Sequence, residues 1–212
     1  MSEILYIRNS NINQTLIILL GIPGSGKSYF ANDYILKHPN TIILSRDTFR
    51  FGFCNSGIVP DYIEELITET IFDIFKNLVW RGYNIILDQT NCKEKDFKLY
   101  VKYIKKKLNV EFYIFDIDLE YAKERNIKSS KERVVRDMDM DRMFENYQII
   151  RNNCNFKLYG DVNIINIIKD EIKINNYNDQ DRISFDKYRE IRQKEANEFI
   201  NFLTNYNSPR NK

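Results

Sequence analysis

Apolar residues fall in short, nearly continuous runs that alternate with longer amphipathic stretches along the chain. A short apolar run between polar residues is typical of a strand that is buried on both faces of a parallel sheet. Five such runs occur, at residues 15–20, 41–45, 84–88, 110–116 and 162–168. Strands that alternate with helices predict an α/β fold, in which a five-stranded parallel sheet carries helices on both faces.

The stretches between these runs have the length and the spacing of apolar residues that helices need. Pro60 suits the first turn of one helix, and Gly82 suits its C-terminal cap. The repeated strand–helix–strand units should be right-handed crossovers. Helices are expected at residues 27–38, 60–81, 93–107, 119–128 and 132–151.

The two ends of the chain depart from this alternation. Residues 1–12 are expected to be a short N-terminal extension, with a small strand at residues 4–7. Residues 169–183 are polar and rich in asparagine, which predicts a loop, and residues 184–205 have the pattern of an amphipathic helix. We therefore expect one domain over residues 1–168, on which the loop and helix of residues 169–212 pack. A partner or oligomer surface is the alternative role of that helix.

Composition limits the classes of protein that fit. With 212 residues, of which 43% are hydrophobic, the chain can bury one sizeable core. No secretory signal is recognisable at the start, and no apolar run reaches the length of a membrane span. Three widely spaced cysteines indicate a reducing, cytoplasmic environment. A net charge of +2 means that any nucleic-acid site must be a local patch.

The most specific motif follows the first apolar run. Residues 21–28 read GIPGSGKS, which is a complete G-x-x-x-x-G-K-[ST] phosphate-binding loop between a predicted strand and a predicted helix. The lysine can reach the β- and γ-phosphates of ATP, and the final serine can ligate Mg²⁺. The candidate nucleotide-binding residues here are Gly21, Pro23, Gly24, Ser25, Gly26, Lys27 and Ser28.

Asp47 and Arg50 follow the second predicted strand, at the edge of the sheet where α/β folds bind ligands. A carboxylate near the phosphate-binding loop can accept a proton from an attacking hydroxyl. On a helical turn, Arg50 would project to the same side as Asp47. An N-terminal helix cap with a solvated arginine is an equally good interpretation of these positions.

Asp88 ends the third predicted strand, as a carboxylate that holds Mg²⁺ directly or through water would do. Thr90 and Asn91 come next and offer hydrogen-bonding groups to a substrate. Both residues could instead, or in addition, cap the following helix.

A basic segment follows the fourth predicted strand and favours a lid over a solvated face. Phosphoryl transfer needs cations around the developing charge, and a closing lid supplies them. The cations of this segment are Lys123, Arg125, Lys128, Lys131, Arg133 and Arg136.

Taken together, the segments GIPGSGKS, SRDTFR, ILDQTN, AKERN and VVRDMDMDRMF resemble the phage-type 5′-hydroxyl polynucleotide kinases, a family of small P-loop kinases. The resemblance covers approximately residues 14–168. It implies ATP-dependent transfer of the γ-phosphoryl group to the 5′-OH of RNA or DNA, in nucleic-acid repair.

The resemblance also implies roles for individual residues. Lys27 and Ser28 would serve the phosphates and Mg²⁺, Asp47 would be the general base, and Arg50 would hold the acceptor phosphate. Arg125 would be the lid arginine on the ATP phosphates. The second lid arginine of the family falls at Ser129 here, so Arg133 or Lys128 would take its place.

Two other functions fit parts of the same pattern. The first is a zeta-toxin-like or small-metabolite P-loop kinase, which would share the phosphate-binding loop and the catalytic aspartate. The second is an ATP-binding switch or repair subunit that transfers no phosphate efficiently. The oligomeric state is not indicated by the sequence.

Overall fold

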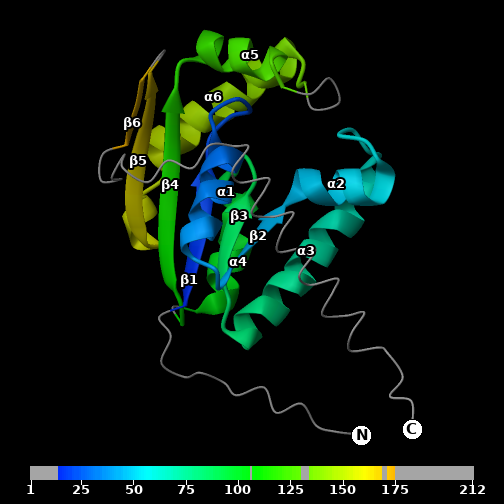
Figure 1. The fold of residues 1–212 in the computed structure, drawn as a ribbon, viewed down its shortest axis with the longest axis vertical. Helices are drawn as coiled ribbons and strands as arrows, with labels where there is room; N and C mark the ends of the chain where they lie inside the picture. The colour runs from blue at the N-terminus through cyan, green and yellow to red at the C-terminus, as the bar shows by residue number, and fades with distance from the viewer. Residues whose placement is uncertain (1–13, 106, 130–133, 169–170, 175–212) are drawn as a thin grey trace, which may run out of the picture. The chain divides into compact units, whose positions relative to one another are not determined.

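The computed structural model describes residues 14–105, 107–129, 134–168 and 171–174. Its strands form one sheet in the order β2-β3-β1-β4-β5-β6 (Figure 1). The first five strands pair in parallel, which confirms the predicted five-stranded parallel sheet. The strands are β1 Thr15–Leu20, β2 Thr41–Ser45, β3 Asn84–Asp88, β4 Asn109–Ile117, β5 Asp161–Ile168 and β6 Glu171–Ile174.

The register of the sheet brings three loops together at one edge. Asp88, the last residue of β3, pairs with Ser45 at the end of β2 and with Leu19 near the end of β1. The segments that follow these strands therefore begin side by side at the carboxyl edge, where α/β sheets bind ligands.

Residues 171–174 correct one prediction, because they form a strand where the sequence analysis expects a loop over residues 169–183. β6 pairs antiparallel with β5, and Ile172 lies opposite Ile167. The segment Glu-Ile-Lys-Ile alternates polar and apolar residues, which is a pattern typical of a strand. The strand predicted at residues 4–7 and the helix predicted at residues 184–205 lie outside the described residues.

Helices cover both faces of the parallel strands. Successive side chains of a strand point to opposite faces of the sheet. The contacts of two consecutive residues of β4 therefore show which helix lies on each face. The Phe30 ring of α1 lies 4.6 Å from the Tyr113 ring, whereas the Phe97 ring of α4 lies 5.1 Å from the Phe112 ring. The helices are α1 Lys27–Lys37, α2 Arg46–Cys54, α3 Asp61–Arg81, α4 Glu94–Ile104, α5 Leu119–Ile127, α6 Asp137–Asn153 and the 3-10 helix η2 Phe156–Leu158.

The core consists of β1 and β3 with the aromatic rings that pack on them. Residues 16–20 and 85–87 are fully buried, as expected of strands covered on both sides. On the face of α4, the Phe75 ring of α3 lies 4.9 Å from the Tyr100 ring of α4. None of the described helices is long and apolar enough to cross a membrane.

Candidate nucleotide and acceptor site

The phosphate-binding loop runs from the buried end of β1 to the first turn of α1. Gly24 has a φ of +79°, and a Cβ at this position would lie 2.4 Å from the carbonyl oxygen of Ala122 on α5. Gly26 caps α1 with a φ of +92°. Both positions need glycine, and the turn directs the N-terminus of α1 at the loop, where backbone N–H groups attract anions.

Lys27 is buried and directed into the loop. Its ammonium Nζ donates to the Ile22 carbonyl at 2.8 Å and lies 3.3 Å from the Ser25 hydroxyl. Burial lowers the pKa of Lys27, and the nearby carboxylates of Asp88 and Asp47 oppose this effect only in part. The carboxylates help to keep the Lys27 ammonium charged, and a charged ammonium donates strong hydrogen bonds to phosphate oxygens.

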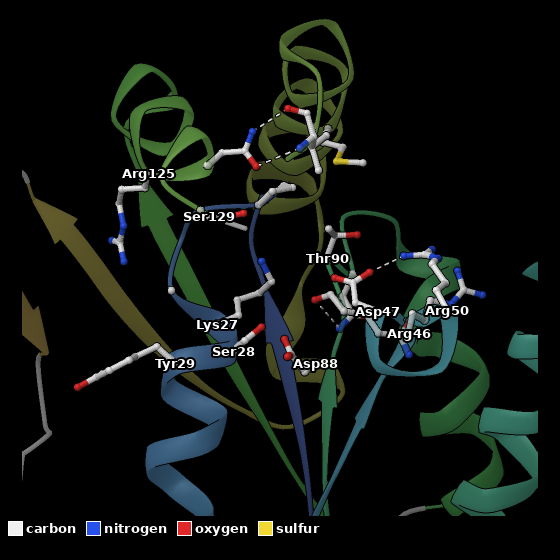
Figure 2. Close-up of a pocket in the computed structure, with 18 of the residues that line it drawn as sticks. Lys27, Ser28, Tyr29, Arg46, Asp47, Arg50, Asp88, Thr90, Arg125 and Ser129 are labelled. Carbon is white, nitrogen blue, oxygen red and sulfur yellow. Dashed lines mark hydrogen bonds and ion pairs between the residues drawn. The ribbon is translucent and has the colours of Figure 1, made fainter. Parts of the chain in front are cut away.

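Ser28 and Asp88 lie together on the floor of the site, below Lys27 (Figure 2). A hydroxyl and a carboxylate are hard oxygen ligands of the kind that Mg²⁺ prefers, with phosphates and water completing the octahedron. Within the part of the chain that the structure describes, no cluster of three acidic, histidine or cysteine side chains could hold a metal by itself. The residues present therefore fit a Mg²⁺ ion that depends on the nucleotide for its other ligands.

The loop after β3 is joined to the phosphate-binding loop by backbone contacts. The N–H of Gly21 donates to the Thr90 carbonyl at 3.1 Å, and the amide Nδ2 of Asn91 donates to the Leu19 carbonyl at 2.7 Å. Asn91 is fully buried and has a φ of +49°. This amide thus holds the ends of β1 and β3 together. The cap of α4 is instead supplied by Asp96, which accepts from the Lys93 N–H at 3.1 Å.

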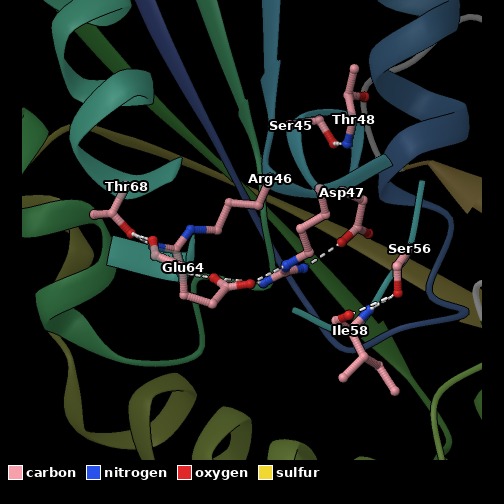
Figure 3. Close-up of polar contacts among 9 residues, drawn as sticks. Ser45, Arg46, Asp47, Thr48, Ser56, Ile58, Glu64 and Thr68 are labelled. Atoms are coloured by element: carbon pink, nitrogen blue, oxygen red, sulfur yellow. Dashed lines mark hydrogen bonds and ion pairs between the residues drawn. The ribbon is translucent and has the colours of Figure 1, made fainter. Parts of the chain in front are cut away.

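A network of charges surrounds the residues that follow β2 (Figure 3). Arg50 donates from Nη1 to Asp47 at 2.6 Å, and from Nε and Nη2 to both carboxylate oxygens of Glu64 on α3. Arg46 lies 3.8 Å from the same carboxylate and donates to the Thr68 hydroxyl. The two arginines therefore lie on either side of Glu64, and Asp47 contacts Arg50 at the end of the network that is exposed to solvent.

The electrostatics of this network favour the charged forms. Burial opposes the charge of Arg50, but its hydrogen bonds to Glu64 and Asp47 outweigh burial and raise its pKa. Burial likewise opposes ionisation of Glu64, and the Arg50 contact outweighs it, so the pKa of Glu64 is lowered. Arg46 and Glu64 have no predicted role in the sequence analysis. Arg46 stands beside Asp47 in the SRDTFR motif, whereas no spacing rule points to Glu64.

Of the predicted lid cations that the structure describes, Arg125 is the one that lines the pocket over the phosphate-binding loop, and Lys123, Lys128 and Arg136 are not part of its lining. A Cβ at Gly26 would lie 3.6 Å from the Nη2 atom of Arg125, and the guanidinium carbon of Arg125 lies 5.7 Å from the centre of the Tyr121 ring. Lys123 instead pairs with Asp141 at 2.7 Å, and Arg136 pairs with its neighbour Asp139 on α6. Lys131 and Arg133 lie outside the described residues.

Asn126 closes the base of the lid segment, a role that the sequence does not signal. Its Nδ2 donates to the Val135 carbonyl at 2.7 Å, and its Oδ1 accepts from the Val135 N–H at 3.2 Å. The side chain is buried. These two bonds thus hold Val135, just before α6, against Asn126 near the end of α5.

These groups enclose a pocket of about 410 Å³. It extends from the phosphate-binding loop to α2 on one side and to α5 on the other, so the side chains of these three segments line one space (Figure 2). Gly21 and Ser25 lie outside its lining, and Ser25 is fully buried. The predicted site residues that line it are Pro23, Gly24, Gly26, Lys27, Ser28, Asp47, Arg50, Asp88, Thr90, Asn91 and Arg125.

Comparison with known protein families matches residues 16–148 to the AAA domain. Among solved structures, the Pnkp1/Rnl/Hen1 RNA repair complex contains a chain that is 26% identical, with a TM-score of 0.60 over 70% of this chain. The match covers 49% of that chain, so this protein spans about half of its length.

Two further solved structures share the fold at lower identity. One is AvrRxo1-ORF1:-ORF2 with ATP, at 14% identity and a TM-score of 0.61, over 87% of this chain and 64% of the other. The second is the PezAT chromosomal toxin-antitoxin system of Streptococcus pneumoniae, at 15% identity and a TM-score of 0.52, over 89% and 88%. Both likenesses show the fold alone.

Proposed function

Because the chain belongs to the AAA domain family and folds as a P-loop kinase, we propose that it is an ATP-dependent 5′-hydroxyl kinase of RNA or DNA. One observation carries this proposal. Asp47, a candidate base, is held by Arg50 in the pocket that also contains Lys27 and Arg125. In this arrangement the base would accept the proton of a hydroxyl group, and the arginine would bind a phosphodiester next to that hydroxyl. The 5′ end of a nucleic acid has both groups.

The donor half of the site binds the triphosphate. Backbone N–H groups at the start of α1 surround the phosphates, while Lys27 and Arg125 neutralise the charge that develops on the γ-phosphoryl group. Ser28 and Asp88 would hold Mg²⁺, which supplies further charge neutralisation when bound. The Arg125 side chain reaches over the loop from α5, with its Nη2 atom 3.6 Å from where a Cβ at Gly26 would lie.

The acceptor half of the site aligns the hydroxyl. The 5′-oxygen attacks the γ-phosphorus in line, the bond to the β–γ bridging oxygen breaks, and ADP leaves. Asp47 accepts the hydroxyl proton during this step, and its carboxylate is 64% exposed, so substrate can reach it. Arg50 contacts the phosphate on the 3′ side of the accepting nucleoside, with its guanidinium oriented by Glu64.

Similarity to a chain of an RNA repair complex supports a role in nucleic-acid repair, and we include that role in the proposal. A cytoplasmic site of action fits the three cysteines, all of which are free thiols.

The test is transfer of label from γ-labelled ATP to a panel of acceptors. The panel contains 5′-OH RNA, 5′-OH DNA, the same oligonucleotides with a 5′-phosphate, and hydroxylated metabolites. We expect label only on the 5′-OH oligonucleotides. Lys27→Ala should remove nearly all labelling, which would exclude a contaminating kinase. Lys37→Ala, at the other end of α1, should retain labelling and so show that the loss is specific to Lys27. Labelling of metabolites alone would contradict the proposal and favour a small-metabolite kinase.

A further inference from the structure

We propose that three lysines on the outer face of α4 bind the phosphodiester backbone of the acceptor strand, beyond the nucleotide whose 5′-hydroxyl reacts. These residues, Lys95, Lys98 and Lys102, are called the lysine track below. The inference rests on the proposed function. It adds a contact outside the catalytic groups, and it makes the affinity for an acceptor depend on the length of the acceptor.

The first observation is a concentration of positive charge in one segment. Residues 93–107 contain seven lysines and two acidic residues, which gives the segment a net charge of +5. The whole chain has a net charge of +2, so all its other residues together sum to −3. A polyanion is therefore attracted to α4 and to the residues just after it, while the rest of the chain does not attract it by net charge.

The second observation is the arrangement of these lysines on the helix. Phe97, Tyr100 and Ile104 form the buried side of α4. The lysine track follows the spacing i, i+3 and i+7, which places its members in one row on the side away from the core. Lys95 and Lys102 are exposed and Lys98 is half-buried. A row of cations parallel to the helix axis thus faces the solvent.

Most of these charges are not compensated by the protein. Lys98 donates to Glu94 at 3.0 Å, an exposed pair of the kind that contributes little to stability. Within the described part of the chain, Lys95 and Lys102 form no ion pair, and neither does Lys105 just after the helix. A phosphate can therefore replace water and counterions at these ammonium groups without breaking a strong contact.

The third observation is continuity with the acceptor groups. Asp96, in the first turn of α4, lines the pocket together with Asp47 and Arg50. Lys95 is its neighbour in the chain, so a strand that leaves the pocket across this first turn meets the lysine track at Lys95. Seven residues separate Lys95 from Lys102, which is ~10 Å at ~1.5 Å per residue, or about three nucleotides at ~3.4 Å per nucleotide.

Charge and position together select nucleic acid as the occupant. Phosphates recur at a regular spacing along a strand, so a row of cations can contact several of them in turn. Such contacts position a strand and carry no sequence information. An acidic protein or an anionic membrane would match the charge, but neither would explain why the row begins beside the pocket that takes the 5′ end.

The test compares acceptors of two lengths while the salt concentration is varied. A 5′-OH dodecanucleotide should have a lower KM than a nucleoside 3′-monophosphate, and its log KM should rise more steeply with the logarithm of the salt concentration. Each phosphate contact on a single strand contributes about 0.7 to that slope, so the double variant Lys95→Ala/Lys102→Ala should lower the slope by about 1.4. Between 0.05 and 0.2 M salt, the KM advantage of wild type over this variant should then shrink by about 7-fold. The kcat, and the KM for the monophosphate, should stay unchanged.

Two further double variants are the controls. Lys95→Arg/Lys102→Arg keeps both charges and should behave as wild type. Lys37→Ala/Lys76→Ala removes the same net charge from two lysines that already pair with aspartates, and should leave the salt slope unchanged. If this control lowers the slope as much as Lys95→Ala/Lys102→Ala does, net charge alone explains the effect and the lysine track is overturned.

Binding of a fluorescent 5′-phosphorylated dodecanucleotide, measured by anisotropy, keeps the two proposals separate. If wild type phosphorylates no acceptor but binds this probe more tightly than Lys95→Ala/Lys102→Ala does, the proposed function fails and the lysine track stands. Equal affinities and equal salt slopes for the two proteins would overturn the lysine track and leave the kinase intact. Tighter binding of polyglutamate, or of phosphatidylserine vesicles, than of the oligonucleotide would also overturn it, in favour of an acidic protein or a membrane.

Discussion

Replacing Glu64 by glutamine tests whether this carboxylate positions the acceptor arginine. Glu64 accepts from both Nε and Nη2 of Arg50, and these two side chains are only 27% and 22% exposed. A glutamine can accept one of these bonds, but its NH₂ group would face the second donor. We therefore expect Arg50 to lose its fixed orientation, while the ATP site on the other side of the pocket stays unchanged.

The size of the effect follows from the contacts. Hydrogen bonds to charged groups contribute ~1.5–3 kcal/mol when buried, and partial exposure reduces this to ~1–2 kcal/mol. Since ~1.4 kcal/mol is a factor of ten, Glu64→Gln should raise the acceptor KM by about 5- to 30-fold. The pKa of Glu64 lies below its ordinary value of 4.5, so the ion pair stabilises the fold above that pH. Its contribution is lost as the pH falls through the lowered pKa, so the stability difference between wild type and variant should disappear there.

The assay is a double-mutant cycle on steady-state kinetics with a 5′-OH oligonucleotide. Glu64→Gln should have no further effect on KM in an Arg50→Ala background, because Glu64 acts through that arginine. Glu65→Gln, at the exposed neighbouring position, is the control and should behave as wild type. If the effects of Glu64→Gln and Arg50→Ala on KM multiply, or if Glu64→Gln raises the KM for ATP instead, the reasoning is wrong.

Three other predictions concern the remaining parts of the site. Lys27→Ala should lower kcat by about 10²–10³-fold with the fold retained by circular dichroism, because a cation is removed from the transferring phosphoryl group; near-normal turnover would place Lys27 elsewhere. Asp47→Asn should keep ATP affinity by calorimetry while kcat falls by about 10²–10⁴-fold, and a loss of ATP affinity alone would assign Asp47 to the nucleotide. Burial raises the pKa of the Cys92 thiol to about 11, so this thiol should react slowly with an alkylating agent at pH 8. Mass spectrometry should then find the exposed Cys54 labelled and Cys92 unlabelled. Faster labelling of Cys92 than of Cys54 would show that the loop after β3 opens.

The parallel strands and the phosphate-binding loop are predictable from the sequence because their signals are local. β1, β2 and β3 have the predicted bounds, since each is a continuous apolar run bounded by polar residues or, after β1, by the first glycine of the phosphate-binding loop. The loop residues are fixed by glycines that no other side chain could replace, as the contact between Gly24 and Ala122 shows.

The elements that the sequence analysis did not predict lack such a signal. α2 has only nine residues and buries none of its side chains, so no core-facing stripe marks its extent in the sequence. The contacts of Arg50 with Glu64 and of Asn126 with Val135 join residues on different segments, whose approach depends on the fold. A run of charges in the sequence also does not show which cation lies over the phosphate-binding loop and which one pairs with a neighbouring carboxylate. Arg125 and Lys123 illustrate these two outcomes.

The most direct measurement of the central claim compares two small acceptors, a 5′-OH nucleoside 3′-monophosphate and the bare nucleoside. If Asp47 activates the hydroxyl while Arg50 holds the adjacent phosphate, kcat/KM should be at least ten times higher for the monophosphate, and Arg50→Ala should remove most of that preference. The preference should also weaken as salt is raised, since a phosphate contact releases counterions. Equal efficiency on both acceptors, with no effect of Arg50→Ala, would contradict the assignment of this protein as a polynucleotide 5′-hydroxyl kinase.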